Sequence, residues 1–166
     1  MCPLLATDRA FVRVDAVLRD ACGKQFTGAV ARIEQGGRLR FEQAFGATRD
    51  DALARPVFVD SFFDLASITK PLISTLALMM VARGRLNLDA LLTDILPEWR
   101  GRRHERITLR MLLAHDSGMN SGADYRELRD KNVVGFALER DLASEPGEHV
   151  IYSDLGFIVV GEILER

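Results

Sequence analysis

Ser67 and Lys70 stand three residues apart in Ser67-Ile68-Thr69-Lys70, which opens an apolar run from Pro71 to Ala82. The run predicts a helix that begins at this tetrapeptide, because proline is tolerated only in the first turn of a helix. A serine in the first turn lies at the positive end of the helix dipole, and a lysine three residues later lies on the same face. One turn of helix therefore offers a nucleophile together with a cation or a base, which is the pair that acyl transfer can use.

The residues before this turn predict a helix and a β-hairpin. Apolar residues at helical spacing predict a first helix from Asp8 to Cys22, and Gly23 suits its end. Two alternating segments, Ala29 to Glu34 and Leu39 to Phe45, flank the paired glycines Gly36 and Gly37 and predict the hairpin.

The residues after this turn predict mostly helices. Gly84 is expected to end the helix that Ser67 opens, and Thr108 is expected to cap a short helix. Polar residues 119–131 predict a loop, and residues 133–140 a helix. The final segment, Asp154 to Arg166, is apolar on most sides, so other structure must cover it.

The composition excludes several classes of function. The 166 residues are 48% hydrophobic with a net charge of −2, which is typical of one globular domain and lacks the basic footprint of a nucleic-acid-binding protein. Two cysteines are too few for a disulfide framework, and the three histidines lack metal-ligand spacing. His104 and His149 are predicted at the surface. No nucleic-acid partner, metal or cofactor is implied.

Neither the start of the chain nor its apolar runs suggest export or membrane insertion. The first residues lack the basic start and continuous apolar core of a secretory signal. The longest apolar stretch, from Leu72 to Ala82, is far shorter than the ~20 residues that span a bilayer. These features predict a cytoplasmic protein without a membrane partner.

Three segments resemble the serine β-lactamase-related hydrolases of the class C and esterase type. They are Ser67-Ile68-Thr69-Lys70, the stretch Leu112-Leu113-Ala114-His115-Asp116-Ser117-Gly118, and Tyr152-Ser153-Asp154, in this order and at similar spacing. The resemblance implies an α+β fold of the β-lactamase/transpeptidase type, with a helical cluster packed on an antiparallel sheet. It extends over nearly all of the chain but covers only the amino-terminal part of the family's domain.

The resemblance also implies a role for each site residue. Ser67 would form the acyl-enzyme, Lys70 would act as base or proton shuttle, and Tyr152 would be the second proton-transfer group. Asp154 would lie in the substrate-binding part of the site, where the family's Tyr-x-Asn motif has asparagine. Because a carboxylate beside Lys70 would keep the lysine protonated, Asp154 favours a phenolate or a water as base, and the assignment stays open.

One motif of the family has no counterpart before Arg166. The family carries a later Lys-Thr-Gly or His-x-Gly strand, which provides the second oxyanion-hole donor beside the backbone N–H of Ser67. We therefore expect residues 1–166 to form an incomplete domain that lacks its carboxy-terminal strands. Such a chain, with apolar faces uncovered on its last helix and its hairpin, is expected to aggregate or to be partly molten.

These features lead to one preferred function and one alternative. The preferred function is a serine hydrolase that transfers an acyl group to water from an ester, an amide or a β-lactam, with an esterase mildly favoured. The alternative is a catalytically inactive remnant, or a half-domain that needs a carboxy-terminal partner chain.

Simpler interpretations of single residues also remain. Tyr152 could be an interface tyrosine whose hydroxyl caps a helix, and Asp154 could be the N-cap of the last helix. His115, Asp116 and Ser117 are adjacent in sequence and cannot face one another as a triad, so His115 is predicted to be structural.

Overall fold

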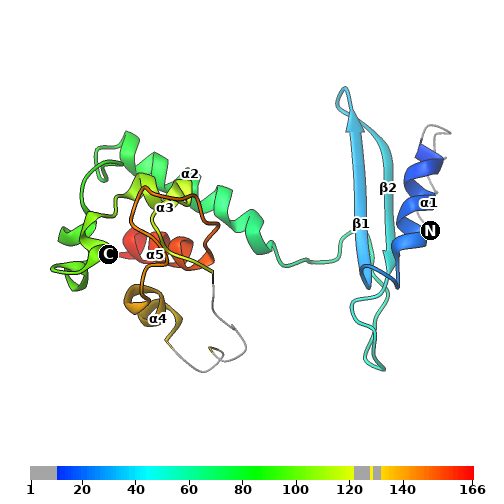
Figure 1. Ribbon diagram of the computed structural model, residues 1–166. Helices are drawn as coiled ribbons and strands as arrows, with labels where there is room; N and C mark the ends of the chain where they lie inside the picture. The colour runs from blue at the N-terminus through cyan, green and yellow to red at the C-terminus, as the bar shows by residue number, and fades with distance from the viewer. Residues whose placement is uncertain (1–10, 122–127, 129–131) are drawn as a thin grey trace. The chain divides into compact units, whose positions relative to one another are not determined.

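The computed structural model describes residues 11–121, 128 and 132–166. The chain divides into two compact units, Met1–Asp64 and Leu65–Arg166 (Figure 1). The first unit contains the sheet and the second contains the helices that carry Ser67 and Lys70. Whether residues 1–166 together form one incomplete domain stays a prediction.

The first unit contains the predicted hairpin. Strand β1 (Gly28–Gln35) pairs antiparallel with β2 (Arg38–Gly46), and Gln35 lies opposite Arg38. Between them Gly36 and Gly37 have φ values of 59° and 71°. This two-residue turn with two positive φ angles needs glycine, and its twist matches that of the strands. The paired glycines therefore correctly predicted both the hairpin and its turn.

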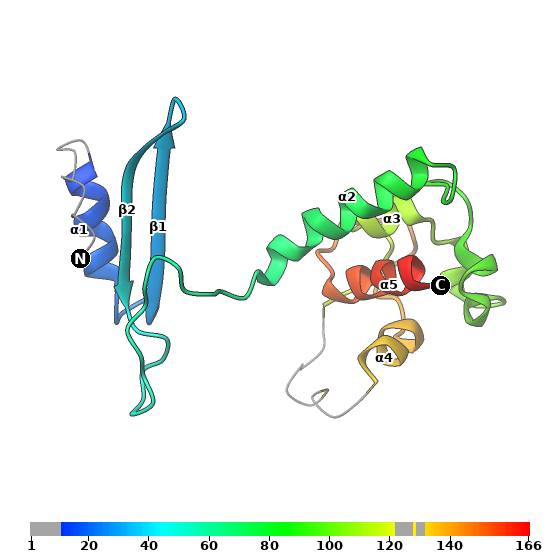
Figure 2. The same ribbon diagram turned by 180° about the vertical axis from the view of Figure 1, so that it is seen from behind.

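Helix α1 (Val12–Ala21) lies beside this hairpin in both views (Figures 1 and 2). The ring of Phe11 lies 6.2 Å from that of Phe41, and the Arg19 guanidinium lies 5.6 Å from the Phe45 ring centre. The chain leaves the helix through Gly23, at a φ of 79°. The predicted helix is confirmed within the described residues, and its predicted start at Asp8 lies outside them.

The second unit is helical. Its elements are the 3₁₀ turn η2 (Ala66–Ile68), α2 (Thr69–Ala82), α3 (Leu109–Ala114), α4 (Val133–Glu139) and α5 (Asp154–Glu165), with further 3₁₀ turns at Leu92–Asp94, Pro97–Trp99 and Arg103–Arg106. Helix α5 packs against α2, α3 and α4 (Figure 2). This packing explains the apolar sequence of α5, because Leu155, Val159 and Val160 are all fully buried. The predicted loop over residues 119–131 falls mostly outside the described residues.

Side-chain caps begin three of these helices. Thr108 Oγ1 accepts the backbone N–H of Met111, and Asn132 Oδ1 accepts that of Gly135. At α5 the cap is Ser153, whose Oγ accepts the N–H of Gly156 at 2.9 Å. The interpretation of Asp154 as this N-cap is therefore wrong. Its carboxylate is not used as a cap and instead faces Lys70.

His104 also differs from expectation. Its side chain is buried, with 3% of the residue exposed, and its ring centre lies 5.3 Å from that of Trp99. Nε2 lies 2.9 Å from the carbonyl oxygen of Arg140, which gives the buried ring a polar partner. The sequence neighbours of His104 are charged, so only the packing of Trp99 could have indicated its burial. His149 is exposed, as predicted.

Candidate active site

Ser67 lies in the strained entrance to α2. The preceding Ala66 has a φ of 44°, which a non-glycine residue rarely adopts, and the backbone then enters η2 and α2. Pro71 is the third residue of α2, where its missing N–H breaks no helical hydrogen bond. The entry turn leaves Ser67 exposed at the start of α2, as a nucleophile requires.

The structure brings the four predicted site residues together. Ser67 Oγ lies 2.6 Å from the hydroxyl oxygen of Tyr152. Lys70 Nζ donates to Ser67 Oγ at 3.3 Å and also to Asp154 Oδ1. Tyr152 and Asp154 come from the segment that leads into α5, 85 and 84 residues away from their partners in sequence. The result is a continuous hydrogen-bonded chain from Tyr152 through Ser67 and Lys70 to Asp154.

Lys70 is held as a cation. Only 13% of its side chain is exposed, and its Nζ lies 4.6 Å from the Tyr152 ring centre and 5.7 Å from that of Phe157. Burial alone lowers the pKa of Lys70, but the hydrogen bond and charge of Asp154, together with Tyr152, outweigh it and raise the pKa. The two aromatic faces stabilise the same charged form.

Tyr152 is affected in the opposite direction. The adjacent Lys70 ammonium, and then the Ser67 hydroxyl, lower the pKa of the Tyr152 phenol. The side chain is about half exposed, at 52% for the residue, so solvent can exchange protons with it. The pair therefore combines a lysine that resists deprotonation with a tyrosine that is easier to deprotonate than usual.

Two further residues hold the Tyr152 segment, and the sequence did not assign them to the site. His115 Nδ1 accepts the N–H of Ser153 at 3.1 Å. Ser121 Oγ donates to the carbonyl oxygen of Tyr152 at 3.0 Å and accepts the N–H of Asp154 at 2.8 Å. The available signal for His115 was that it lies in one of the three resembled segments, whereas nothing in the sequence marked Ser121.

A small cavity adjoins this cluster. It has a volume of about 360 Å³, and its lining combines Lys70 and Asp154 with apolar residues of α2 and α5, among them Ile73, Phe157 and Ile158. Gly161 also lines it, and open space surrounds the position that a Cβ there would take. The cavity lies between the two helices that supply the ion pair.

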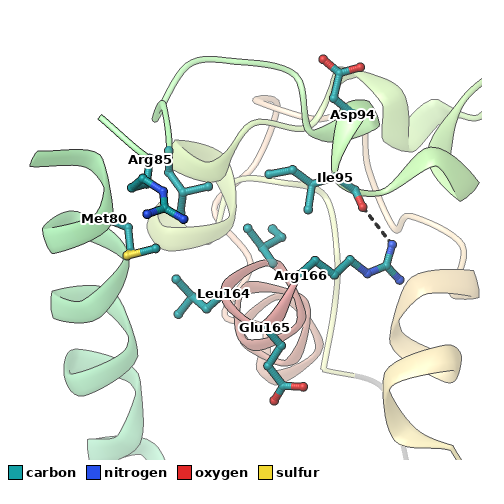
Figure 3. Close-up of a pocket in the computed structure, with 9 residues that line it drawn as sticks. Met80, Arg85, Asp94, Ile95, Leu164, Glu165 and Arg166 are labelled. Atoms are coloured by element: carbon teal, nitrogen blue, oxygen red, sulfur yellow. Dashed lines mark hydrogen bonds between the residues drawn. The ribbon is translucent and has the colours of Figure 1, made fainter. Parts of the chain in front are cut away.

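A second cavity, of about 500 Å³, lies at the other end of α2 and α5 (Figure 3). Met80 lines it from α2, Leu164 and Arg166 from the end of the chain, and Arg166 donates to the carbonyl oxygen of Ile95 at 2.9 Å. It contains none of the four residues of the cluster. Despite its larger volume, it offers no nucleophile with a proton-transfer partner, so the cluster at Ser67 is the better candidate.

Within residues 11–121, 128 and 132–166, no three histidine, cysteine or acidic side chains form a group that could hold a metal ion. The helices in the same residues are all too short, or too polar, to cross a membrane.

Comparison with known proteins decides the family. Residues 11–166 match the family model described as beta-lactamase. The chain belongs to the beta-lactamase family. This assignment agrees with the resemblance seen in the motifs and confirms the predicted fold class.

Curated relatives in this family have different activities. The chain is 34% identical over 177 residues to esterase EstB of Burkholderia gladioli, covering 93% of this chain and 44% of the esterase. It is 27% identical to an N-acetylmuramyl-L-alanine amidase of Bacillus subtilis, covering 93% of this chain and 40% of the amidase. The chain thus spans less than half the length of these relatives. Hydrolases and acyltransferases among them support a serine hydrolase-type function at the level of the family.

Solved structures of the beta-lactamase fold agree. D-amino acid amidase from Ochrobactrum anthropi is similar with a TM-score of 0.74 at 25% identity, covering 91% of this chain and 43% of the amidase. A mutant of simvastatin synthase from Aspergillus terreus has a TM-score of 0.72 at 28% identity, covering 100% of this chain and 47% of the synthase.

Proposed function

We propose that this chain carries the nucleophile of a serine hydrolase, in which Ser67 takes the acyl group of an ester, an amide or a β-lactam and passes it to water. The observation that carries the proposal is the 2.6 Å contact between Ser67 Oγ and the Tyr152 hydroxyl, beside a lysine held as a cation by Asp154. A serine hydroxyl is a weak nucleophile until a base removes its proton, and this contact provides a direct path for that proton.

Tyr152 is the preferred base. As phenolate it accepts the proton of Ser67 while Oγ bonds to the substrate carbonyl carbon, and the Lys70 ammonium stabilises the phenolate charge. The tyrosine then gives this proton to the leaving oxygen or nitrogen as the tetrahedral intermediate collapses to the acyl-enzyme. In the second half, Tyr152 takes a proton from water, the resulting hydroxide attacks the ester carbonyl, and the proton returns to Ser67.

The developing oxyanion needs donors. The backbone N–H of Ser67 is one candidate, and the family's second donor lies on the Lys-Thr-Gly or His-x-Gly strand, a motif that these 166 residues do not contain. Loss of one donor typically lowers turnover ~10²-fold to 10³-fold. We therefore expect slow turnover by this chain alone, and formation of the acyl-enzyme is the step to measure.

Esters are the favoured substrates within this proposal. The relative at 34% identity is named an esterase, and an ester has a better leaving group than an amide for a site with an incomplete oxyanion hole. Amides and β-lactams remain the other members of the proposed substrate class.

The test is the intact mass of the chain after incubation with a fluorophosphonate probe. We expect one stoichiometric adduct, which Ser67→Ala abolishes and Ser74→Ala, on the adjoining helix α2, leaves unchanged. An adduct that survives in Ser67→Ala would refute the assignment of the nucleophile.

The second candidate is a half-domain whose site is completed by a carboxy-terminal partner chain. What favours it is that the chain covers only 40% to 47% of the relatives compared above. Folded, soluble chain that gives no adduct alone, but reacts at Ser67 when mixed with the carboxy-terminal half of the esterase from Burkholderia gladioli, would favour this candidate. Failure of both reactions would indicate an inactive remnant.

A further inference from the structure

His115 contacts the backbone on both sides of Tyr152. Its carbonyl oxygen accepts the N–H of Ile151 at 2.7 Å, and its Nδ1 accepts the N–H of Ser153 at 3.1 Å. The residue reaches both groups because it adopts a left-handed conformation at the end of α3, with φ at 62° and ψ at 26°. One residue thus binds the backbone N–H groups of the residues before and after the tyrosine.

The imidazole ring also packs on the Tyr152 side chain. The ring centres lie 4.7 Å apart, at an angle of 36°, and on the same imidazole the Phe157 ring lies at 5.1 Å. The Tyr152 side chain is otherwise held by the Ser67 hydroxyl and the Lys70 ammonium, and about half of the residue is exposed. Contact with His115 therefore helps to keep the phenol directed at Ser67 Oγ.

This arrangement requires one tautomer of a neutral imidazole. Nδ1 can accept the Ser153 N–H only while it carries no proton, so the ring proton must be on Nε2. A second proton would turn Nδ1 into a donor facing another donor. The hydrogen bond to Ser153 would then be lost and the Tyr152 segment would be released on one side.

We propose that His115 is a positioning residue for Tyr152, and that its protonation lowers the reactivity of Ser67. The inference rests on the proposed function, because it concerns the same site. No atom of His115 needs to touch the substrate; the residue acts through the backbone and ring of the tyrosine.

Groups around His115 favour its neutral form. Burial, and then the charge of Lys70 on α2, lower the pKa of the imidazole, while the carboxylate of Asp154 on α5 opposes them. Tyr152 faces the ring from the adjoining segment, and Asp116 follows in the chain of His115 itself. Protonation of His115, and the fall in Ser67 reactivity that goes with it, is therefore expected below the usual histidine pKa of ~6.5.

The first experiment is a pH titration of the chain by nuclear magnetic resonance, with ¹⁵N-labelled histidine and ¹³C-labelled tyrosine. Signals are assigned with His115→Asn and Tyr152→Phe. We expect His115 to be the Nε2–H tautomer at pH 7.5, and the Tyr152 ring signals to move when His115 titrates. Two results would overturn the proposal, whether or not Ser67 reacts. One is a proton on His115 Nδ1 at pH 7.5, and the other is Tyr152 ring signals that do not change as His115 titrates.

The second experiment is the rate of fluorophosphonate labelling between pH 5 and 8 for matched variants. His115→Ala is expected to label about 10-fold to 100-fold more slowly at every pH, as misplaced catalytic groups do. His115→Asn keeps an acceptor near the position of Nδ1 and tolerates the left-handed backbone, so it should restore most of the rate but lose the inflection of His115. His149→Ala, at an exposed histidine, should behave as the parent.

These outcomes separate the two hypotheses. An inflection that persists unchanged in His115→Asn would overturn the role of His115 while leaving the Ser67 proposal intact. Absence of any labelling in the parent chain would count against the proposed function, and the resonance titration would still decide whether His115 positions Tyr152.

Discussion

At the scale of single residues, the candidate site is defined by opposite effects on two pKa values. Asp154 and the aromatic rings keep Lys70 charged, and that charge makes Tyr152 easier to deprotonate. Asparagine at position 154 would remove the carboxylate that holds the lysine. The substitution of aspartate into the family's Tyr-x-Asn pattern therefore bears directly on which group acts as base.

Asp154→Asn distinguishes the two possible bases. Without the carboxylate, burial lowers the pKa of Lys70, so its charge is lost at a lower pH. If Tyr152 is the base, labelling of Ser67 should fall about tenfold at pH 7.5, and the alkaline loss of rate should begin at lower pH. If neutral Lys70 were the base, the same substitution would accelerate labelling. The pH–rate profile of the fluorophosphonate reaction decides between them.

Tyr152→Phe removes the proposed base and keeps the ring on His115. The labelling rate should fall about 10²-fold to 10⁴-fold, the usual contribution of a positioned acid–base group. The melting temperature should hardly change, because the hydroxyl is at the surface. A variant that labels at the parental rate would exclude Tyr152 as base.

At the scale of the elements, helix α5 has both a structural role and a chemical role. Its apolar residues form the centre of the helical unit, and its first residue, Asp154, faces Lys70. Ser153, which caps the helix, also donates to the carbonyl oxygen of Asn120 at 3.2 Å. The position of the carboxylate thus depends on how α5 begins.

Ser153→Ala is expected to affect both stability and reactivity. Loss of the cap should lower the free energy of unfolding by about 1 kcal/mol in urea denaturation. Thr108→Ala removes the matched cap of α3 and should cost a similar amount. Only Ser153→Ala should also slow labelling of Ser67. Equal labelling by the two variants would show that the start of α5 does not control the site.

At the scale of the whole molecule, exposed apolar surface favours self-association. The last helix was predicted to have an uncovered apolar face, but α2, α3 and α4 cover α5. Exposed apolar side chains of the helical unit include three on α2, Leu72, Leu76 and Met79, which share one helical face. Residues facing outward on this helix, rather than on α5, are expected to drive self-association.

The double variant Leu72→Lys, Leu76→Glu tests this expectation. It should increase the monomer fraction in size-exclusion chromatography with light scattering and leave the melting temperature nearly unchanged, because both side chains are exposed. Substitution at the buried Leu155 is the contrasting control and should unfold the helical unit. A parent chain that is already monomeric and melts cooperatively would contradict the prediction.

Stability of the helical unit should also depend on pH. Burial lowers the pKa values of His104 and His115 in the folded chain, so the unfolded chain binds more protons below the usual histidine pKa of ~6.5. Unfolding free energy should therefore decrease as the pH falls from about 7 through 6.5 toward the lowered pKa values. Urea denaturation at pH 7.5 and 5.5 measures the difference, which His115→Asn should reduce. An equal free energy at both values would contradict the buried neutral form.

The sequence by itself determined the features that depend on neighbouring residues. Gly36 and Gly37 set the hairpin turn, Thr108 and Gly84 marked helix ends, and the spacing of Ser67 and Lys70 placed both at one helix entrance. Their physical causes are local: allowed φ angles, capping hydrogen bonds and helical periodicity. The family motifs added Tyr152 and Asp154 to this site.

Only the tertiary structure decided how distant segments meet. It brought the Tyr152 hydroxyl to Ser67, gave Ser153 rather than Asp154 the role of cap, buried His104 beside Trp99, and set His115 against the tyrosine. Each of these contacts joins atoms whose approach depends on how the helices pack. Packing is a collective property of the apolar core, so no local pattern in the sequence could specify those distances.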